Sequence, residues 1–223
     1  MRLKQLILVL LILLCALPGS AQNPAGGGGQ RGGERGAPGG QGRGGGGGAA
    51  AAAAAPVLTL SIPGFPDGAQ VPVRFSQAAA GAAPGEGTSP AINWTNPPAG
   101  TQSFVLNMRD MDVVRNRTTD DQAHWVVWNI PGTATGLPEG VPKGSQLADG
   151  SYQISATGPV YRGPGAPATG PLHHYVFELF ALDNKLDVQP SADAFETRAN
   201  VMKAIQGHIL GKAVYVGLFR RPQ

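Results

Sequence analysis

Short apolar runs, separated by turns rich in glycine and proline, follow one another along the chain from residue 57 onward. The runs are rich in β-branched and aromatic residues, and such runs between turn residues favour β-strands over helices. Strands are therefore predicted at residues 57–62, 71–75, 103–110, 124–130, 152–156, 174–183 and 213–219.

These runs differ in how apolar and polar positions follow one another. Apolar and polar residues alternate in VLTLSI (57–62) and FVLNMR (104–109), which predicts strands with one solvent-exposed face. The apolar stretches are longer in WVVWNI (125–130) and YVFELFAL (175–182). Strands of that kind are buried on both faces, so these two are expected at the centre of a sheet.

One amphipathic helix is predicted late in the chain, over residues 192–206. Ser191 is the expected N-cap, and the carboxylate of Asp193 suits the positive end of the helix dipole. Gly207 fits the position that ends a helix. The apolar residues of the expected buried face are Phe195, Ala199, Met202 and Ile205. Many short strands with a single helix predict a mainly β fold, a sandwich or barrel with an attached helix.

Residues 1–21 have the parts of a secretory signal peptide. Two basic residues precede an apolar run at 6–17, and small residues at 19–21 offer a cleavage site. The run is shorter than the roughly 20 residues of a membrane span, which favours cleavage over an uncleaved anchor. A lipoprotein is less favoured, because two leucines precede Cys15. Cleavage would remove this only cysteine, and it predicts a periplasmic or secreted protein without an integral membrane domain.

Residues 22–56 are rich in glycine and alanine and contain almost no large apolar side chains, so we expect a disordered tether before a domain at 57–223. Of the 17 basic and 14 acidic residues, five basic and one acidic residue precede position 56. The domain then carries 12 basic and 13 acidic residues, a net charge of −1. This balance gives the domain no general electrostatic reason to bind nucleic acid.

Chemically capable side chains gather at the ends of the predicted strands. Asp110 ends one strand, His124 begins another, and His173 precedes a third. A loop at 161–171 carries glycines whose backbone can approach a ligand closely. A pocket with a protonated histidine and free loop N–H groups suits a small anion. Asp110 would hold a histidine protonated, or accept a hydrogen bond from a ligand hydroxyl or ammonium.

The order of several motifs resembles the phosphatidylethanolamine-binding protein family, especially its bacterial Raf kinase inhibitor-like branch. The motifs are TSPAINWTNPPAGTQSFVLNMRDMD, HWVVWNIP, YRGPGAPATGPLHHYVFELFALD and GHILGKAVYVGLFRR. The resemblance implies an antiparallel Greek-key β-sandwich with peripheral helices, one of them near the C-terminus. It also implies a pocket for phosphate-like anions, including phospholipid head groups.

Carried over position by position, the resemblance implies a ligand site formed by Asp110, His124, Gly163, Gly165, Pro167, His173 and Tyr175. It gives Asp112 a structural role in its loop, and strand alternation points His174 away from the site. The chain departs from the family motifs where Met111 replaces a proline between the two aspartates, and where His174 replaces an arginine.

The leading functional hypothesis is an exported, non-catalytic domain that binds a small anion, either a phosphate or carboxylate or a phospholipid head group, without cofactor or metal. One alternative is a protein that inhibits an extracytoplasmic protease or kinase by direct contact. A metal-dependent hydrolase is a further alternative, because two histidines and an aspartate are able to hold a divalent ion. The motifs G-x-S-x-G and H-E-x-x-H are absent from the sequence, which disfavours the common hydrolases.

Overall fold

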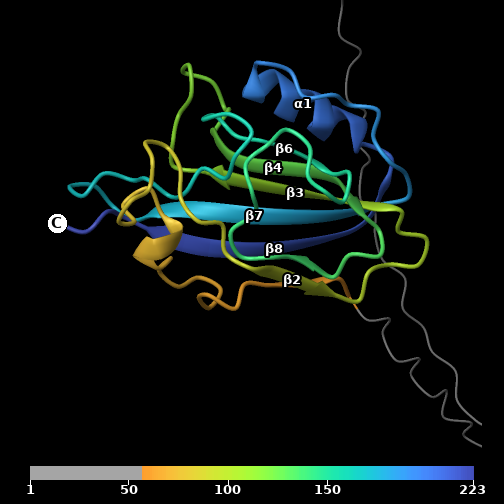
Figure 1. Cartoon of the computed structure of the whole chain (residues 1–223), viewed down its shortest axis with the longest axis horizontal. Coiled ribbons are helices and arrows are strands. Elements are labelled where there is room, and N and C mark those ends of the chain that lie inside the picture. Colours follow the sequence, from red (N-terminus) through yellow and green to blue (C-terminus); the bar gives the residue numbers. More distant parts are fainter. Residues whose placement is uncertain (1–56) are drawn as a thin grey trace, which may run out of the picture. The chain divides into compact units, whose positions relative to one another are not determined.

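The computed structural model of the chain describes residues 57–223, and the predicted signal peptide and tether lie outside these described residues. Within them, two antiparallel sheets and the helix α1 (Ala194–Ala204) account for most of the regular structure (Figure 1). The mainly β fold predicted above is confirmed. No helix in this part of the chain is long and apolar enough to cross a membrane.

The larger sheet has five strands in the order β6-β4-β3-β7-β8. Their bounds are Ser103–Asp110 (β3), Gln122–Pro131 (β4), Tyr152–Ile154 (β6), His173–Leu182 (β7) and Ile209–Phe219 (β8). The smaller sheet, in the order β1-β2-β5, consists of Thr59–Ser61, Ile92–Thr95 and Gly136–Leu137. Figure 1 shows α1 on the side of the larger sheet where β4 and β6 lie.

Both faces of the larger sheet are covered around β3. Phe104 and Met108 belong to the core between the two sheets, whereas Val105 belongs to a second core with Trp128 and with Val201 of α1. We call the first the inner face and the second the helix face. The predicted solvent-exposed face of 104–109 is therefore wrong, because α1 and its flanking segments cover it. In the smaller sheet, the alternation predicted for 57–62 is confirmed.

One predicted strand is absent from the structure, and two short strands were not predicted. Residues 71–75 do not form a strand, since the 3₁₀ turn Val73–Phe75 follows Pro72, which has no N–H to donate to a ladder. The strands β2 and β5 were not predicted. They are four and two residues long, which is too short for a recognisable period in the sequence.

The helix begins two residues later than predicted. Asp193, not Ser191, is the N-cap, and its carboxylate accepts hydrogen bonds from the backbone N–H groups of Phe195 and Glu196. Gly207 adopts a positive φ of 85° beyond the last turn, as expected of a residue that ends a helix. The buried face is also rotated from the prediction and consists of Ala194, Thr197, Val201 and Ile205.

Candidate functional site

The left-hand ends of β3 and β7 in Figure 1 bring three predicted site residues together. Asp110 and Tyr175 are register partners on neighbouring strands, and His173 lies two residues before Tyr175 on the same face. Nδ1 of His173 lies 2.9 Å and 3.1 Å from the two carboxylate oxygens of Asp110. The strand pairing thus places an aspartate, an imidazole and a phenol at one end of the inner face.

A β-bulge in β4 adds His124 to this group. Met108 pairs with Trp125 but Arg109 pairs with Ala123, so His124 is an extra residue in its strand. A bulge re-aims the side chain of the inserted residue, which strict alternation would have pointed to the face opposite Trp125. The ring of His124 instead lies 5.0 Å from the ring of Tyr175 in an edge-to-face contact.

His124 is electrically neutral at neutral pH. Burial lowers the pKa of its imidazole to about 4, and the neighbouring Arg162 carbonyl and the Asp110 charge oppose this shift only in part. Nδ1 lies 2.9 Å from the carbonyl oxygen of Arg162, which only accepts, so Nδ1 carries the proton. Nε2 is left as an acceptor. The protonated histidine expected in the pocket is therefore not His124 at neutral pH.

The hydroxyl of Tyr175 holds the loop that was expected to offer free N–H groups. Its oxygen accepts hydrogen bonds of 3.1 Å from the N–H groups of both Gly165 and Ala166. Burial raises the pKa of Tyr175, and the negative charge of Asp110 raises it further. The phenol therefore stays protonated and shares a hydrogen bond with the Asp110 carboxylate, while both loop amides are occupied.

The two glycines of this loop are needed for contact with another segment of the chain. A Cβ on Gly163 would lie 2.8 Å from the carbonyl oxygen of Phe75, and one on Gly165 would overlap the side chain of Gln77. The Gln77 amide donates a 2.7 Å hydrogen bond to the carbonyl of Gly163. The glycines thus let the loop pack closely against residues 75–77, and this packing forms the wall of the site.

A cavity of about 140 Å³, which we call the inner cavity, opens among these residues. Of the seven predicted residues, it is lined by Asp110, His124, Gly165, Pro167, His173 and Tyr175. Gly163 does not line it and lies behind the wall. Sequence reasoning missed the remaining lining residues, which are Gln77, Val113, Gln122, Arg162 and Ala166.

Arg162 supplies the cation that His124 does not. Its guanidinium is partly buried, and one nitrogen, Nη1, donates a 2.7 Å hydrogen bond to Thr157. Its Nε is buried and has no hydrogen-bond partner among the described residues. Burial lowers the pKa of Arg162, yet an arginine remains charged at neutral pH. Arg162 is thus the one described residue lining the inner cavity that carries a permanent positive charge.

Asp112 and His174 pair with each other outside the cavity. Oδ2 of Asp112 accepts a 2.6 Å hydrogen bond from the backbone N–H of His174 and lies 3.0 Å from its Nδ1. Both side chains are substantially exposed, in agreement with the structural role predicted for Asp112 and the outward direction predicted for His174. Ligand atoms of Asp110, Asp112 and His173 all lie within 4.8 Å of one another. This set, which differs from the two-histidine set considered above, has the donor types that a divalent ion accepts.

Comparison with known proteins identifies the family. The family model of the phosphatidylethanolamine-binding protein matches residues 61–220. The UPF0098 protein of Methanothermobacter thermautotrophicus is 37% identical over 166 residues, which cover 74% of this chain and 99% of the relative. LppC of Mycobacterium tuberculosis, which carries a provisional lipoprotein designation, is 33% identical over 163 residues, 73% of this chain and 72% of its own.

Solved structures agree at the level of the fold. YbcL of Escherichia coli, a member of the mammalian PEBP family, gives a TM-score of 0.60 with 24% identity and covers 74% of this chain and 98% of its own. The homologue CT736 from Chlamydia trachomatis gives a TM-score of 0.59, also with 24% identity and the same coverage. With the family model and the relatives, these findings establish that the chain belongs to the phosphatidylethanolamine-binding protein family.

Proposed function

We propose that this chain is a non-catalytic binding protein that holds a small ligand by its phosphate or carboxylate group in the inner cavity. The observation that carries the proposal is the inner cavity itself, which is lined by Asp110, His124, His173 and Tyr175 and by one arginine, Arg162. A guanidinium is a donor group suited to an anionic oxygen, and charge-assisted hydrogen bonds are the stronger kind.

The remaining polar groups of the inner cavity favour a ligand that is not purely anionic. Asp110 is 2% exposed and carries a carboxylate, and the neutral His124 presents an acceptor at Nε2. A phosphate dianion has no hydrogen to donate to these two acceptors, the Asp110 carboxylate and Nε2 of His124. Phosphoethanolamine would satisfy them, because its ammonium donates to Asp110 while its phosphate meets Arg162. A cavity of about 140 Å³ suits such a head group rather than a whole phospholipid.

Binding is favoured over catalysis by the kinds of residue around the inner cavity. Its lining residues include no serine, threonine or cysteine that would act as a nucleophile beside the histidines.

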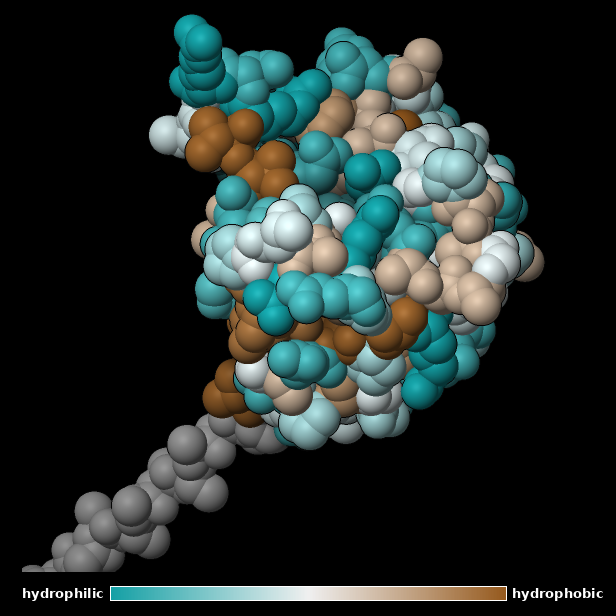
Figure 2. Space-filling model, turned by 90° about the vertical axis from the view of Figure 1, so that its left-hand side faces the viewer, coloured by the Kyte–Doolittle hydropathy of each residue, from teal (hydrophilic) through white to brown (hydrophobic). Residues whose placement is uncertain are grey.

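A small ligand is favoured over a protein partner by the surface around the inner cavity. In the view onto this end of the molecule, hydrophobic residues gather in separate places among hydrophilic ones (Figure 2). Protein interfaces usually centre on one larger apolar patch.

Action outside the cytoplasm forms part of the proposal. The first 21 residues read as a signal peptide, and one relative, LppC, carries the lipoprotein designation. A ligand in that compartment would be a free head group or a small metabolite, since cytosolic kinases are out of reach there.

The test is thermal unfolding of the full chain with phosphoethanolamine, and with ethanolamine as the phosphate-free control. We expect phosphoethanolamine to raise the melting temperature by several degrees at saturation and ethanolamine to leave it unchanged. Replacing His124 by Gln should abolish the rise, whereas His208→Gln, an exposed histidine paired with Asp183, should retain it. An equal rise in both variants, or none in the wild type, would refute the proposal.

A further inference from the structure

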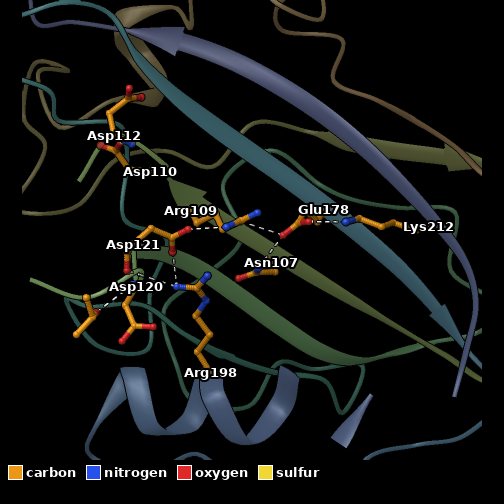
Figure 3. Close-up of polar contacts among 10 residues, drawn as sticks. Asn107, Arg109, Asp110, Asp112, Asp120, Asp121, Glu178, Arg198 and Lys212 are labelled. Atoms are coloured by element: carbon orange, nitrogen blue, oxygen red, sulfur yellow. Dashed lines mark hydrogen bonds and ion pairs between the residues drawn. The ribbon is translucent and has the colours of Figure 1, made fainter. Parts of the chain in front are cut away.

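A second cavity, of about 330 Å³, lies on the helix face of the same strand ends, and we call it the α1 cavity. Its walls come from β3, from the loop at 111–121 and from α1. Because neighbouring residues of a strand point to opposite faces, Arg109 lines this cavity while Asp110 lines the inner one. Figure 3 shows Arg109, Asp121 and Arg198 directed toward one another above α1, with Asp110 pointing elsewhere.

Two of the arginines in this cavity are held by one carboxylate. Asp121 accepts 2.6 Å contacts from Nη1 of Arg109 and from Nη1 of Arg198. Arg109 also contacts Glu178 at 3.1 Å, and Glu178 binds Lys212 at 2.6 Å (Figure 3). Within the described residues, Arg198 makes hydrogen bonds only through Nη1. Its Nε and Nη2 are therefore donors without a protein partner, on a side chain that is fixed in place.

A third arginine completes the charged side of the α1 cavity. The guanidinium of Arg115 lies 3.2 Å from the ring centroid of Phe195 and forms no ion pair within residues 57–223. Two consecutive residues after it, Asn116 and Arg117, have positive φ angles of 52° and 58°. Such a conformation is costly for residues other than glycine. The strained turn brings the backbone N–H of Arg115 to within 3.0 Å of the carbonyl of Asp120.

The other side of the cavity is apolar and comes from one stripe of α1. Phe195, Ala199 and Met202 recur at helical spacing, and the sequence predicted that they would be buried against the sheet. All three line the α1 cavity: Ala199 is exposed and Phe195 is half-buried, whereas Met202 is half-buried and also packs against the core on the helix face. An apolar stripe beside three guanidinium groups is the arrangement of an amphiphilic binding site.

We propose that the α1 cavity binds a small carboxylate that carries a compact apolar group. Three arginines and the carboxylates of Asp120 and Asp121 give the cavity a net charge of +1, which matches one negative charge. The carboxylate group meets Arg115 and Arg198, and the apolar group covers Ala199 and Met202. A phosphate dianion would exceed the charge of the site and leave the apolar stripe exposed to water.

The test uses three probes on the full chain, measured by titration calorimetry at low salt. Phenylacetate carries both features, phenylacetamide lacks the charge, and acetate lacks the apolar group. We expect phenylacetate to bind and each of the other two to bind at least about tenfold more weakly, since one charge-assisted hydrogen bond or one buried ring is worth at least that factor. Equal binding of phenylacetate and phenylacetamide would overturn the proposal, and so would the absence of phenylacetate binding.

Variants locate the binding event. Arg115→Gln removes a lining guanidinium that supports no ion pair in the described residues, and it should weaken phenylacetate binding by about tenfold. Arg117→Gln removes an exposed arginine of the same loop that does not line the cavity, and it should leave binding unchanged. Ala199→Phe, on an exposed helix position, should fill the cavity and abolish binding. Equal effects of the two arginine variants would overturn the assignment.

Amide chemical shifts separate the two cavities in the same sample. Phenylacetate should move the signals of residues 195–202 and leave those of 163–175 in place. Movement at 163–175 alone would place the probe in the inner cavity and refute a site under α1.

Discussion

The two faces of one sheet end carry opposite kinds of chemistry in this molecule. The inner cavity is small and surrounds a buried aspartate, a neutral histidine and one arginine. The α1 cavity is larger and carries three arginines. Neighbouring residues serve both sites, since Arg109 and Asp121 line one cavity while Asp110 and Gln122 line the other. Because neighbouring residues of a strand point to opposite faces, the end of β3 and the loop after it contribute to two separate cavities.

The two cavities also differ in what fixes their side chains. Packing and a bulge place His124, and burial then removes its charge at neutral pH. Ion pairs place Arg109 and Arg198, and their shared partner Asp121 holds them close together. Acid should therefore disturb the inner cavity first, whereas loss of a single carboxylate should disturb the α1 cavity.

The largest expected effect is that of acid on His124. Its pKa is about 4 in the folded chain, below the ordinary value of 6.5, so the unfolded state binds its proton first as the pH falls. Stability from this group is complete above pH 6.5 and is lost as the pH falls toward 4, by roughly 3 kcal/mol in all. Urea unfolding at pH 7, 6, 5 and 4 measures this loss. The carboxylates also respond to acid, so the comparison with His124→Gln isolates the histidine.

His124→Gln should flatten the pH dependence over that range, and His208→Gln should keep the slope of the wild type. A wild-type slope in His124→Gln would show that the buried imidazole does not resist protonation.

The next effect concerns the charged network under α1. Asp121→Ala leaves Arg109 and Arg198 without their shared partner in a partly buried position, and we expect the free energy of unfolding to fall by about 2 to 3 kcal/mol. Chemical denaturation gives the value. Asp183→Ala removes an exposed carboxylate paired with His208, and it should cost less than about 0.5 kcal/mol. Similar losses in the two variants would mean that the network adds nothing beyond a surface pair.

A smaller loss is expected at the wall of the inner cavity. Tyr175→Phe removes the acceptor of two loop N–H groups and should cost about 2 kcal/mol of unfolding free energy. It should also weaken phosphoethanolamine binding, because the phenol positions the loop and the Asp110 carboxylate that line the inner cavity. Tyr152→Phe is the matched control, since its ring stacks on Trp128 and is half-buried on the helix face. Unchanged ligand affinity in Tyr175→Phe would remove the phenol from the proposed contacts.

The smallest effects are the most selective, because they separate the two ligands. Arg162→Gln should weaken phosphoethanolamine binding by about tenfold and spare phenylacetate, and Arg198→Gln should do the reverse. Calorimetry with both ligands on both variants gives four affinities. A variant that weakens both ligands equally would contradict the separation of the two cavities.

Much of the fold followed from local pattern, and its exceptions have physical causes. The predicted strand at 103–110 coincides with β3, because an eight-residue run bounded by turn residues is a clear strand signal, although its alternation wrongly indicated an exposed face. The N-cap was wrong because Ser191 and Asp193 are both competent caps, and only packing decides between them. The stripe of Phe195, Ala199 and Met202 was assigned to the core, because a helix pattern does not state which face meets the sheet.

The candidate site also has features that the sequence predicts and features that it does not predict. Its residues Asp110, His173 and Tyr175 were predicted from motifs, and strand register brings them together. The neutral state of His124 depends on burial, which no local pattern contains. Arg162 lies inside the quoted loop motif, yet its role depends on the direction of its side chain. The signal available in the sequence was a lone arginine beside two glycines.

The contact between Gln77 and Gly163 joins residues 86 positions apart in the sequence. Bringing the two ends of so long a segment together costs chain entropy before the contact between them forms. Contacts between residues far apart in sequence therefore slow folding. The inner cavity therefore gains its wall only when distant segments have docked, late on the folding route. A ligand in the inner cavity therefore binds only the folded state. A tightly bound ligand would slow the unfolding of the whole domain.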